Sequence, residues 1–303
     1  MSKAEMIDPL VDYEAMAATL DATDQYRVLR RLTSRSIIEP YDGSVTRLGL
    51  FVDVETTGLD PSRNEIVELA MVPFSYGVDG RIFNIHQAFE KLREPSQPLS
   101  TKITALTGIT NDMVAGKIID PAEVAAFANR ADLVIAHNAS FDRRFVERFC
   151  DVFVHKPWAC SMSQINWAEE GFEGTKLGYL AMGAGFFYDR HRAANDCLAA
   201  IELLATTLPN SRRLAMAQLL DEARRPDWRI WAENSPFEFK DELKARGYRW
   251  NADGGANPKA WYIDVEDFQR EAELAYLRKQ IYQSDVDITL RMMTAYERFS
   301  ERI

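Results

Sequence analysis

A short β-rich run that carries two carboxylates, from Leu48 to Glu55, constrains the fold more than any other segment. It reads LGLFVDVE, and turn residues close it from Gly58 onward. Its apolar and β-branched residues predict a buried strand over 48–54. Asp53 and Glu55 are two positions apart, so side-chain alternation puts both on one face of that strand. Two such carboxylates repel each other and need protons, donors or a cation, although a solvated face explains the pair equally well when it is taken alone.

The composition is that of a globular protein with an excess of acidic groups. The chain has 303 residues, of which 47% are hydrophobic and 27% charged, and its formal charge at pH 7 is −10. This length is ample for a buried core in one large domain or two. The negative total argues against a protein that coats nucleic acid by bulk charge. It leaves open a protein that handles nucleic acid through metal ions.

Cysteine usage and the absence of long apolar runs predict a cytoplasmic protein. Cys150, Cys160 and Cys197 lack the spacing of a metal site and cannot all pair, so we expect reduced thiols. The first 16 residues hold no apolar run of the signal-peptide type. No stretch reaches the roughly 18 apolar residues of a membrane span, so we expect no membrane association.

The pattern along the chain predicts three regions. Residues 1–47 are expected to form a helical arm, because Leu20, Leu29 and Leu32 stand at helical spacings and a turn follows at Pro40. Residues 48–208 are expected to form an α/β domain with a mixed sheet. Its expected strands are 48–54, 65–74, 82–90 and 131–138, and its expected helices are 121–130, 141–150, 176–185 and 192–208.

The remaining 209–303 are expected to form a small, aromatic-rich α+β domain. Four of the six tryptophans lie there. Expected strands are 228–232, 248–251 and 260–263, and expected helices are 212–224, 237–246, 266–282 and 287–300. Basic and aromatic residues alternate between Lys240 and Tyr262, which fits either a grip for single-stranded nucleic acid or, as we prefer, the core of the domain with solvated charges.

Two further carboxylates and a histidine change the interpretation of the Asp53–Glu55 pair. Asp142 follows the strand LVIAHN at a strand-to-helix junction, and Asp196 lies inside the helix that follows His191. Such junctions meet at one edge of an open α/β sheet, where sites collect. Four carboxylates at that edge could hold two Mg²⁺ or Mn²⁺ ions about 4 Å apart, as in two-metal phosphoryl-transfer sites. A histidine beside them is a candidate general base.

Three motifs resemble those of the DEDDh, or DnaQ-like, 3′–5′ exonucleases. They read DVETTGLDP…EIVELA, LVIAHNASFDRRF and HRAANDCLA, and they cover roughly residues 48–206 in the family's order. The family includes the proofreading epsilon subunit of bacterial DNA polymerase III, RNase T and oligoribonuclease. The resemblance implies an RNase H-like exonuclease fold, here flanked by the N-terminal arm and the C-terminal α+β domain.

The resemblance also implies a role for each acidic position. Asp53, Glu55 and Asp196 would bind one ion, while Asp53 and Asp142 would bind the second. His191 would accept the proton of the attacking water. The product would be a nucleoside 5′-monophosphate released from the 3′ end.

Other motif positions are expected to touch the substrate. The backbone of Thr56, Thr57 and Gly58 is expected to meet the terminal nucleotide, where glycine permits close approach. Leu59 is expected to wedge against the terminal base and Phe141 to stack on a base or sugar, with core packing as the alternative for both. A separate set, His137 and Asn138, is expected to fix the end of the strand by hydrogen bonds, and Asn138 is also counted among the substrate contacts. Thr107 stands where proofreading relatives often have a histidine.

These features predict a metal-dependent 3′–5′ exonuclease that acts on single-stranded 3′ ends, with DNA preferred to RNA. An exoribonuclease of the RNase T type is the nearest alternative. A catalytically silent nucleic-acid-binding or polymerase-associated subunit is a different class of answer, although it would be expected to lack a carboxylate. A polymerase or a repair protein is the expected partner.

Overall fold

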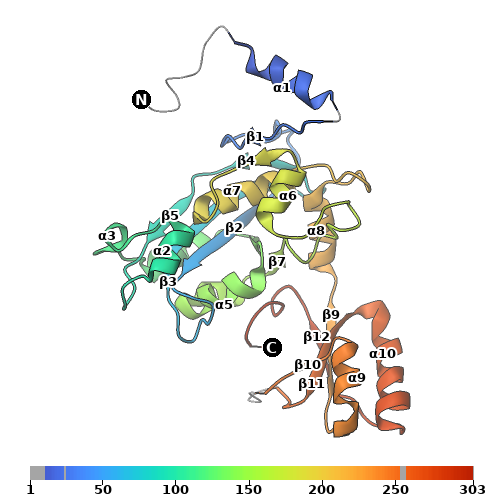
Figure 1. The fold of residues 1–303 in the computed structure, drawn as a ribbon. Helices are drawn as coiled ribbons and strands as arrows, with labels where there is room; N and C mark the ends of the chain where they lie inside the picture. The colour runs from blue at the N-terminus through green and yellow to red at the C-terminus, as the bar shows by residue number, and fades with distance from the viewer. Residues whose placement is uncertain (1–10, 24, 253–256, 303) are drawn as a thin grey trace.

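A mixed six-stranded sheet forms the centre of the molecule, as the sequence predicts (Figure 1). The structure is a computed structural model that describes residues 11–23, 25–252 and 257–302. The strand order is β4-β3-β2-β6-β7, with β5 pairing β3 off this path. β2 runs antiparallel to β3 and parallel to β6, and β6 is parallel to β7. The strands are β2 (Thr46–Thr56), β3 (Ile66–Gly77), β4 (Ile82–Ile85), β5 (Phe89–Leu92), β6 (Leu133–Ala136) and β7 (Trp158–Cys160).

Alternate side chains of β2 enter two hydrophobic clusters on opposite faces of this sheet. Leu50 and Val52 pack with α4 (Pro121–Ala128) and α5 (Ala139–Phe149). Phe51 packs with the cluster of α6 (Leu177–Gly183), α7 (Ala193–Leu204) and α8 (Ala215–Arg224). Because strands alternate with a period of two, Asp53 and Glu55 share the face of Phe51 and point towards α7. This alternation sets the position of the carboxylates.

Short helices complete this part of the chain. α2 (Thr101–Thr107) and α3 (Asn111–Val114) follow β5, and a 3₁₀ turn, η2 (Asp151–His155), follows α5. Gly108 ends α2 in the left-handed region, at φ 72°, where glycine has no steric penalty. The expected strand 82–90 is divided between β4 and β5, which pair with different stretches of β3.

The prediction of a helical arm is wrong for most of residues 1–47. Among the described residues, helix α1 covers only Tyr13–Asp21 and buries no residue. Beyond it the chain is extended, and β1 (Arg30–Arg31) pairs in parallel with β8 (Phe186–Phe187). Leu29 and Leu32 flank this pairing in extended chain, where backbone hydrogen bonds to Gly185 and Phe187 replace those of a helix. Residues 1–10 and 24 lie outside the described part of the chain.

The C-terminal part contains an antiparallel sheet, which we call the C-terminal sheet, of order β10-β11-β9-β12 (Figure 1). Its strands are β9 (Asp227–Ala232), β10 (Arg249–Trp250), β11 (Trp261–Glu266) and β12 (Leu290–Met293). A hydrophobic cluster joins one face of the sheet to the helices that connect its strands. These helices are η3 (Phe237–Phe239), α9 (Lys240–Ala245), η4 (Asp267–Gln269), α10 (Arg270–Tyr276) and a π-helical turn, η5 (Leu277–Tyr282).

The helix expected over 287–300 is wrong. Leu290–Met293 instead form strand β12 against β9, and residues 294–302 continue as turns that pack on α5. The boundary at residues 208 and 209 stays a prediction. Within the described ranges, no helix combines the length and the apolar character that crossing a membrane requires.

Candidate active site

Three carboxylates predicted as ligands meet at the end of β2. Ligand oxygens of Asp53, Glu55 and Asp196 all lie within 4.8 Å of one another. Asp53 and Glu55 come from one face of β2, and Asp196 comes from the first turn of α7. Strand alternation and the packing of α7 on that face therefore bring these three predicted residues together.

Asp142 approaches the same strand from α5, which covers the opposite face of the sheet. Its side chain is buried, and Val54 N–H donates to its Oδ1 over 3.2 Å. It lies in the first turn of α5, directly after the parallel strand β6. Because β2 and β6 are parallel, their carboxyl ends share one edge, and that edge is where the fourth carboxylate lies.

Burial raises the pKa of all four carboxyl groups, and repulsion between carboxylates adds to this for Asp53, Glu55 and Asp142. For Asp53 desolvation is the main cause, followed by the charges of Asp142 and Asp196. Desolvation and the neighbouring charges of Asp196 and Glu68 raise the pKa of Glu55 to about 8. Desolvation also raises the pKa of Asp142 and of Asp196, against the hydrogen bonds that each accepts. A group of acids with this property is stabilised by protons or by a cation.

Both oxygens of Asp196 already have a donor. Tyr188 Oη–H donates to Oδ1 over 2.7 Å, and the backbone N–H of His191 donates to Oδ2 over 2.8 Å. His191 has a left-handed backbone, φ 63°, and an exposed side chain beside the acidic cluster. The predicted spacing of His191 and Asp196 therefore corresponds to a direct contact, but one made by the backbone. Tyr188 has no sequence signal for its role, since only the fold brings it to Asp196.

Glu68 is a fifth carboxylate that was not predicted. It is fully buried on β3, directly opposite Glu55 in the β2–β3 register. It accepts three hydrogen bonds from Arg192, at 3.1, 3.4 and 2.9 Å, and one from Ala193 N–H at 2.9 Å. Glu68 thus holds the N-terminus of α7 next to β3, and Arg192 neutralises its negative charge. The sequence signal that could have identified Glu68 is its position as an acidic residue in the middle of the apolar run IVELAMV.

The turn after β2 is closed by its own hydrogen bonds. Thr56 Oγ1–H donates to Gly58 O over 2.6 Å, and Thr57 N–H donates to Glu65 O over 2.9 Å, so this predicted donor is occupied. A Cβ at position 58 would lie 2.7 Å from the Asn64 carboxamide. Close packing against Asn64 therefore explains why this position is a glycine. Leu59 is 82% exposed, which excludes the alternative of core packing for this residue.

The end of β6 is fixed by its polar residues, as the sequence predicts. The ring nitrogens of His137 bond Ser161 Oγ at 2.9 Å and Thr175 O at 2.7 Å, and burial lowers its pKa to about 4. Asn138 has φ 89°, a conformation that asparagine tolerates, and stands at the N-cap position of α5 without a capping hydrogen bond from its side chain. Phe141 packs on Phe145 with ring centroids 5.0 Å apart, so it has core contacts in addition to its position near the edge.

The donor set fits hard divalent cations. All the grouped ligand atoms are carboxylate oxygens, which Mg²⁺ and Mn²⁺ prefer. Burial, followed by repulsion from neighbouring carboxylates, raises the pKa of Asp53 and of Glu55, so added positive charge would stabilise their ionised forms. Bound ions would supply that charge. We therefore assign Asp53, Glu55, Asp196 and Asp142 as the residues that would hold them.

An acidic edge of this kind on a mixed α/β sheet is typical of metal-dependent nucleases. A family model described as Exonuclease (RNase T) matches residues 50–204, about half of the chain. The chain therefore belongs to the DnaQ-like DEDD exonuclease family. The match spans the three motifs and stops short of the C-terminal sheet.

Curated relatives support the same assignment. The chain is 43% identical over 98 residues to a DNA polymerase III PolC-type of Listeria innocua, covering 31% of this chain and 6% of that protein. It is 30% identical over 247 residues to a DNA polymerase III PolC-type of Thermotoga petrophila, covering 78% and 16%. The chain thus spans a small part of the length of these relatives.

Solved structures with a similar chain path include two exonucleases. One is exonuclease X in complex with 5′ overhanging duplex DNA, at 25% identity and a TM-score of 0.39, covering 56% of this chain and 99% of that chain. The other is E. coli exonuclease I with a dA16 oligonucleotide, at 17% identity and a TM-score of 0.47, covering 73% and 63%.

Proposed function

We propose that this protein is a metal-dependent 3′–5′ exonuclease that releases nucleoside 5′-monophosphates from single-stranded DNA. The observation that carries the proposal is the convergence of Asp53, Glu55 and Asp196 within 4.8 Å, with Asp142 hydrogen-bonded to the same strand. Membership in the exonuclease family supports the same reaction class.

The residues of the site have distinct roles in this proposal. Asp53, Glu55 and Asp196 would hold one Mg²⁺ or Mn²⁺ ion, and Asp142 together with Asp53 would hold a second. When bound, the ions supply Lewis-acid activation of water and neutralise charge on the phosphate. His191 accepts the proton of the water as its oxygen bonds to phosphorus. The bond from phosphorus to the 3′ oxygen of the preceding nucleotide breaks, and that oxygen leaves with a proton from solvent.

The exposed side chains near this edge support a single-stranded end as the substrate. Leu59 projects beside the site with 82% of its surface free, where it wedges against the terminal base. Phe141, on the first turn of α5, stacks on a base or sugar by its remaining exposed edge. The backbone of Gly58 and the side chain of Asn138 complete the contacts that we assign to the terminal nucleotide.

DNA is the preferred substrate in this proposal because the relatives named above are DNA polymerases. A polymerase or a repair protein is accordingly the proposed partner. Three free, buried cysteines are consistent with the reducing cytoplasm that we propose as its location. An exoribonuclease of the RNase T type is tested by the same experiment with matched RNA.

The test uses strands labelled at either end, with Mg²⁺, Mn²⁺ or EDTA. We expect 5′-labelled single-stranded DNA to shorten stepwise, with EDTA and Asp53→Asn each abolishing the ladder. Asp241→Asn, on the exposed face of α9, removes the same charge far from the site and should leave the rate unchanged. Persistent activity in Asp53→Asn would remove the assigned site, and a requirement for the 2′-hydroxyl would replace DNA by RNA.

The role of His191 is tested separately. We expect His191→Ala to lower the turnover rate by roughly 100-fold while metal affinity stays unchanged, because a general base contributes about 10²–10⁴-fold. A pH–rate profile with the same acidic limb as the unmodified protein would show that another group accepts the proton.

A further inference from the structure

A large cleft separates the nuclease part from the C-terminal sheet and is not used in the reaction above. It encloses about 1520 Å³. Its lining takes residues from α5 and from strands β10 and β11. Figure 1 shows α5 in the nuclease part and the two strands in the C-terminal sheet. On the α5 side, the lining residues Ser140, Arg144 and Arg148 recur every four positions and so form one stripe along the helix.

The opposite wall is the face of the C-terminal sheet that its helices leave uncovered. Ile263 and Val265 of β11 belong to the hydrophobic cluster with α9 and α10. The alternate residues Tyr262 and Asp264 therefore point to the other face, and both line the cleft. The neighbouring strands add Arg229 and Arg249 to this wall.

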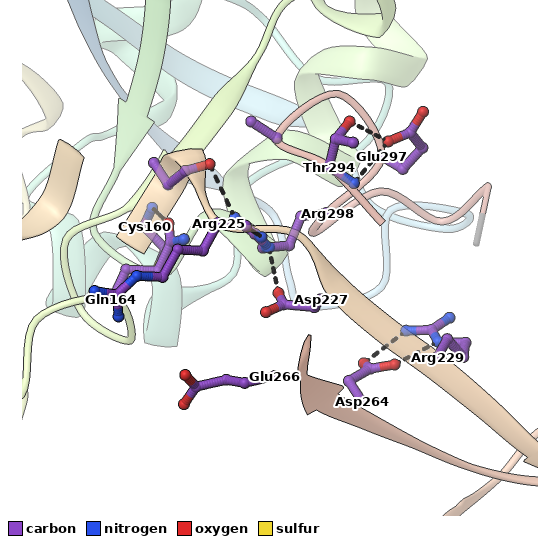
Figure 2. Close-up of polar contacts among 12 residues, drawn as sticks. Cys160, Gln164, Arg225, Asp227, Arg229, Asp264, Glu266, Thr294, Glu297 and Arg298 are labelled. Atoms are coloured by element: carbon purple, nitrogen blue, oxygen red, sulfur yellow. Dashed lines mark hydrogen bonds and ion pairs between the residues drawn. The ribbon is translucent and has the colours of Figure 1, made fainter. Parts of the chain in front are cut away.

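Each wall carries two arginines that share one carboxylate. On the α5 side, Arg144 and Arg148 both bond Glu301, at 2.7 and 2.8 Å. On the sheet side, Arg229 and Arg249 both bond Asp264, at 2.7 and 2.8 Å (Figure 2 shows Arg229 with Asp264). Each group of three thus keeps one uncompensated positive charge.

The other charges of the cleft do not repeat this pattern. Arg225 and Arg298 are each paired with a single carboxylate, Glu222 and Asp227 respectively (Figure 2 shows the second pair). With Glu169 and Glu266 included, the lining is neutral as a whole. Glu266 lies on the same face of β11 as Asp264, so the sheet wall is neutral as a whole. Its two arginines, like the two on α5, are local donors that can each contact a separate phosphate.

The cleft begins beside the catalytic edge. Ser140 belongs to the first turn of α5, the turn that carries Asp142, and its Oγ–H donates to Asn138 Oδ1 over 2.9 Å. Thr175, also in the lining, accepts the hydrogen bond from His137. A strand whose 3′ end lies at Asp142 would therefore find the cleft open next to it.

We propose that this cleft binds the phosphodiester backbone of single-stranded DNA upstream of the 3′-terminal nucleotide. The Arg144–Arg148 pair contacts one phosphate and the Arg229–Arg249 pair contacts another. Tyr262, whose ring lies 4.3 and 5.0 Å from the two guanidinium carbons of its wall, supplies the aromatic surface that single-strand binders combine with basic residues. This inference rests on the proposed exonuclease function.

The test removes one arginine from each pair with Arg148→Gln plus Arg249→Gln. Both side chains are at least half exposed, and each carboxylate keeps one arginine, so folding should be preserved. Two substrates are compared: a single-stranded 20-mer and the small ester thymidine 5′-monophosphate p-nitrophenyl ester. We expect KM for the 20-mer to rise roughly tenfold, while hydrolysis of the ester is unchanged, because only the 20-mer reaches the cleft.

Salt dependence gives a second measurement. Loss of two phosphate contacts should reduce the slope of log affinity against log salt by about 1.4 for a single strand. Arg130→Gln plus Arg224→Gln, two exposed arginines outside the cleft, makes the same change in net charge and serves as the matched control. The proposal is overturned if the cleft variant keeps the KM and the salt slope of the control.

Failure of the proposed function would look different. The unmodified protein would then hydrolyse neither substrate, and binding of a fluorescent 20-mer in EDTA would still test the cleft. Binding that weakens roughly tenfold in Arg148→Gln plus Arg249→Gln but not in the control would support the cleft, and equal binding would overturn it.

Discussion

Tyr188 determines how Asp196 is presented to a cation. Its phenol donates to one carboxylate oxygen and the His191 backbone donates to the other, so the side chain of Asp196 is held from both sides. Burial, together with the charge of Asp196, raises the pKa of Tyr188, so the phenol stays a donor at neutral pH. Tyr188 is therefore a positioning residue that acts through Asp196.

Replacing Tyr188 by phenylalanine should weaken metal binding while the chain stays folded. We expect Tyr188→Phe to raise the Mg²⁺ concentration for half-maximal activity by about 10–100-fold, the usual effect of losing a partner that orients a ligand. Tyr179→Phe, an exposed tyrosine on α6, is the control. An unchanged Mg²⁺ requirement in Tyr188→Phe would show that the His191 backbone alone orients Asp196.

At the scale of elements, the segment of residues 294–302 is tied to α5 by a buried arginine. Arg143 is fully buried, and its guanidinium donates to the carbonyls of Ala295, Tyr296 and Arg298 and to Glu147. Ala295 O also accepts from Trp158 N–H, so the same segment covers edge strand β7. Asp142, next to Arg143, is held in place by a helix that this segment supports.

Loss of Arg143 should destabilise the whole fold. Arg143→Ala removes one donor from Glu147 and one from each of three carbonyls. Glu147 keeps its bonds from Ser300 and Arg302, and Ala295 O keeps Trp158 N–H. The variant still breaks the buried Arg143–Glu147 pair, which costs about 3–5 kcal/mol. The urea midpoint of unfolding measures this loss. Arg144→Ala breaks only an exposed pair with Glu301 and should cost less than about 1 kcal/mol. Equal midpoints for the two variants would contradict the role of Arg143.

The sequence predicts an element well when the order of its apolar and polar residues shows which of its faces are buried. The run from Leu48 to Val54 is apolar on both faces because helices cover both sides of the sheet, so a strand with inward carboxylates was predictable. Arg30–Arg31 and Leu290–Met293 were misread as helical because their partners, β8 and β9, are distant in sequence. The roles of Tyr188 and Glu68 depend on the same long-range packing, which local periodicity does not encode.

At the scale of the molecule, the acidic site links stability to pH and to metal. The four raised pKa values mean that the folded chain retains protons that the unfolded chain releases. Unfolded Asp and Glu titrate near pH 4, and folded Glu55 titrates near pH 8. Without metal, the free energy of unfolding should therefore decrease as the pH rises through this window.

Melting temperatures in EDTA and in Mg²⁺ test this linkage. We expect the melting temperature in EDTA to fall between about pH 5 and pH 8, and Mg²⁺ to restore it most at the upper end, where protons compete least. Apparent metal affinity should increase about tenfold per pH unit for each displaced proton. Glu55→Gln should flatten the EDTA curve. A melting temperature in EDTA that increases with pH would refute the assignment.

The contact of Arg143 with residues 295–298 also has a consequence for how the protein is made. Most of the sheet, α5 and all four carboxylates emerge from the ribosome well before those residues do. Until then the Arg143 guanidinium has no carbonyls to bind, and edge strand β7 lacks the segment that covers it. We therefore expect the final packing of α5 and β7 during synthesis to follow the translation of residues 295–298.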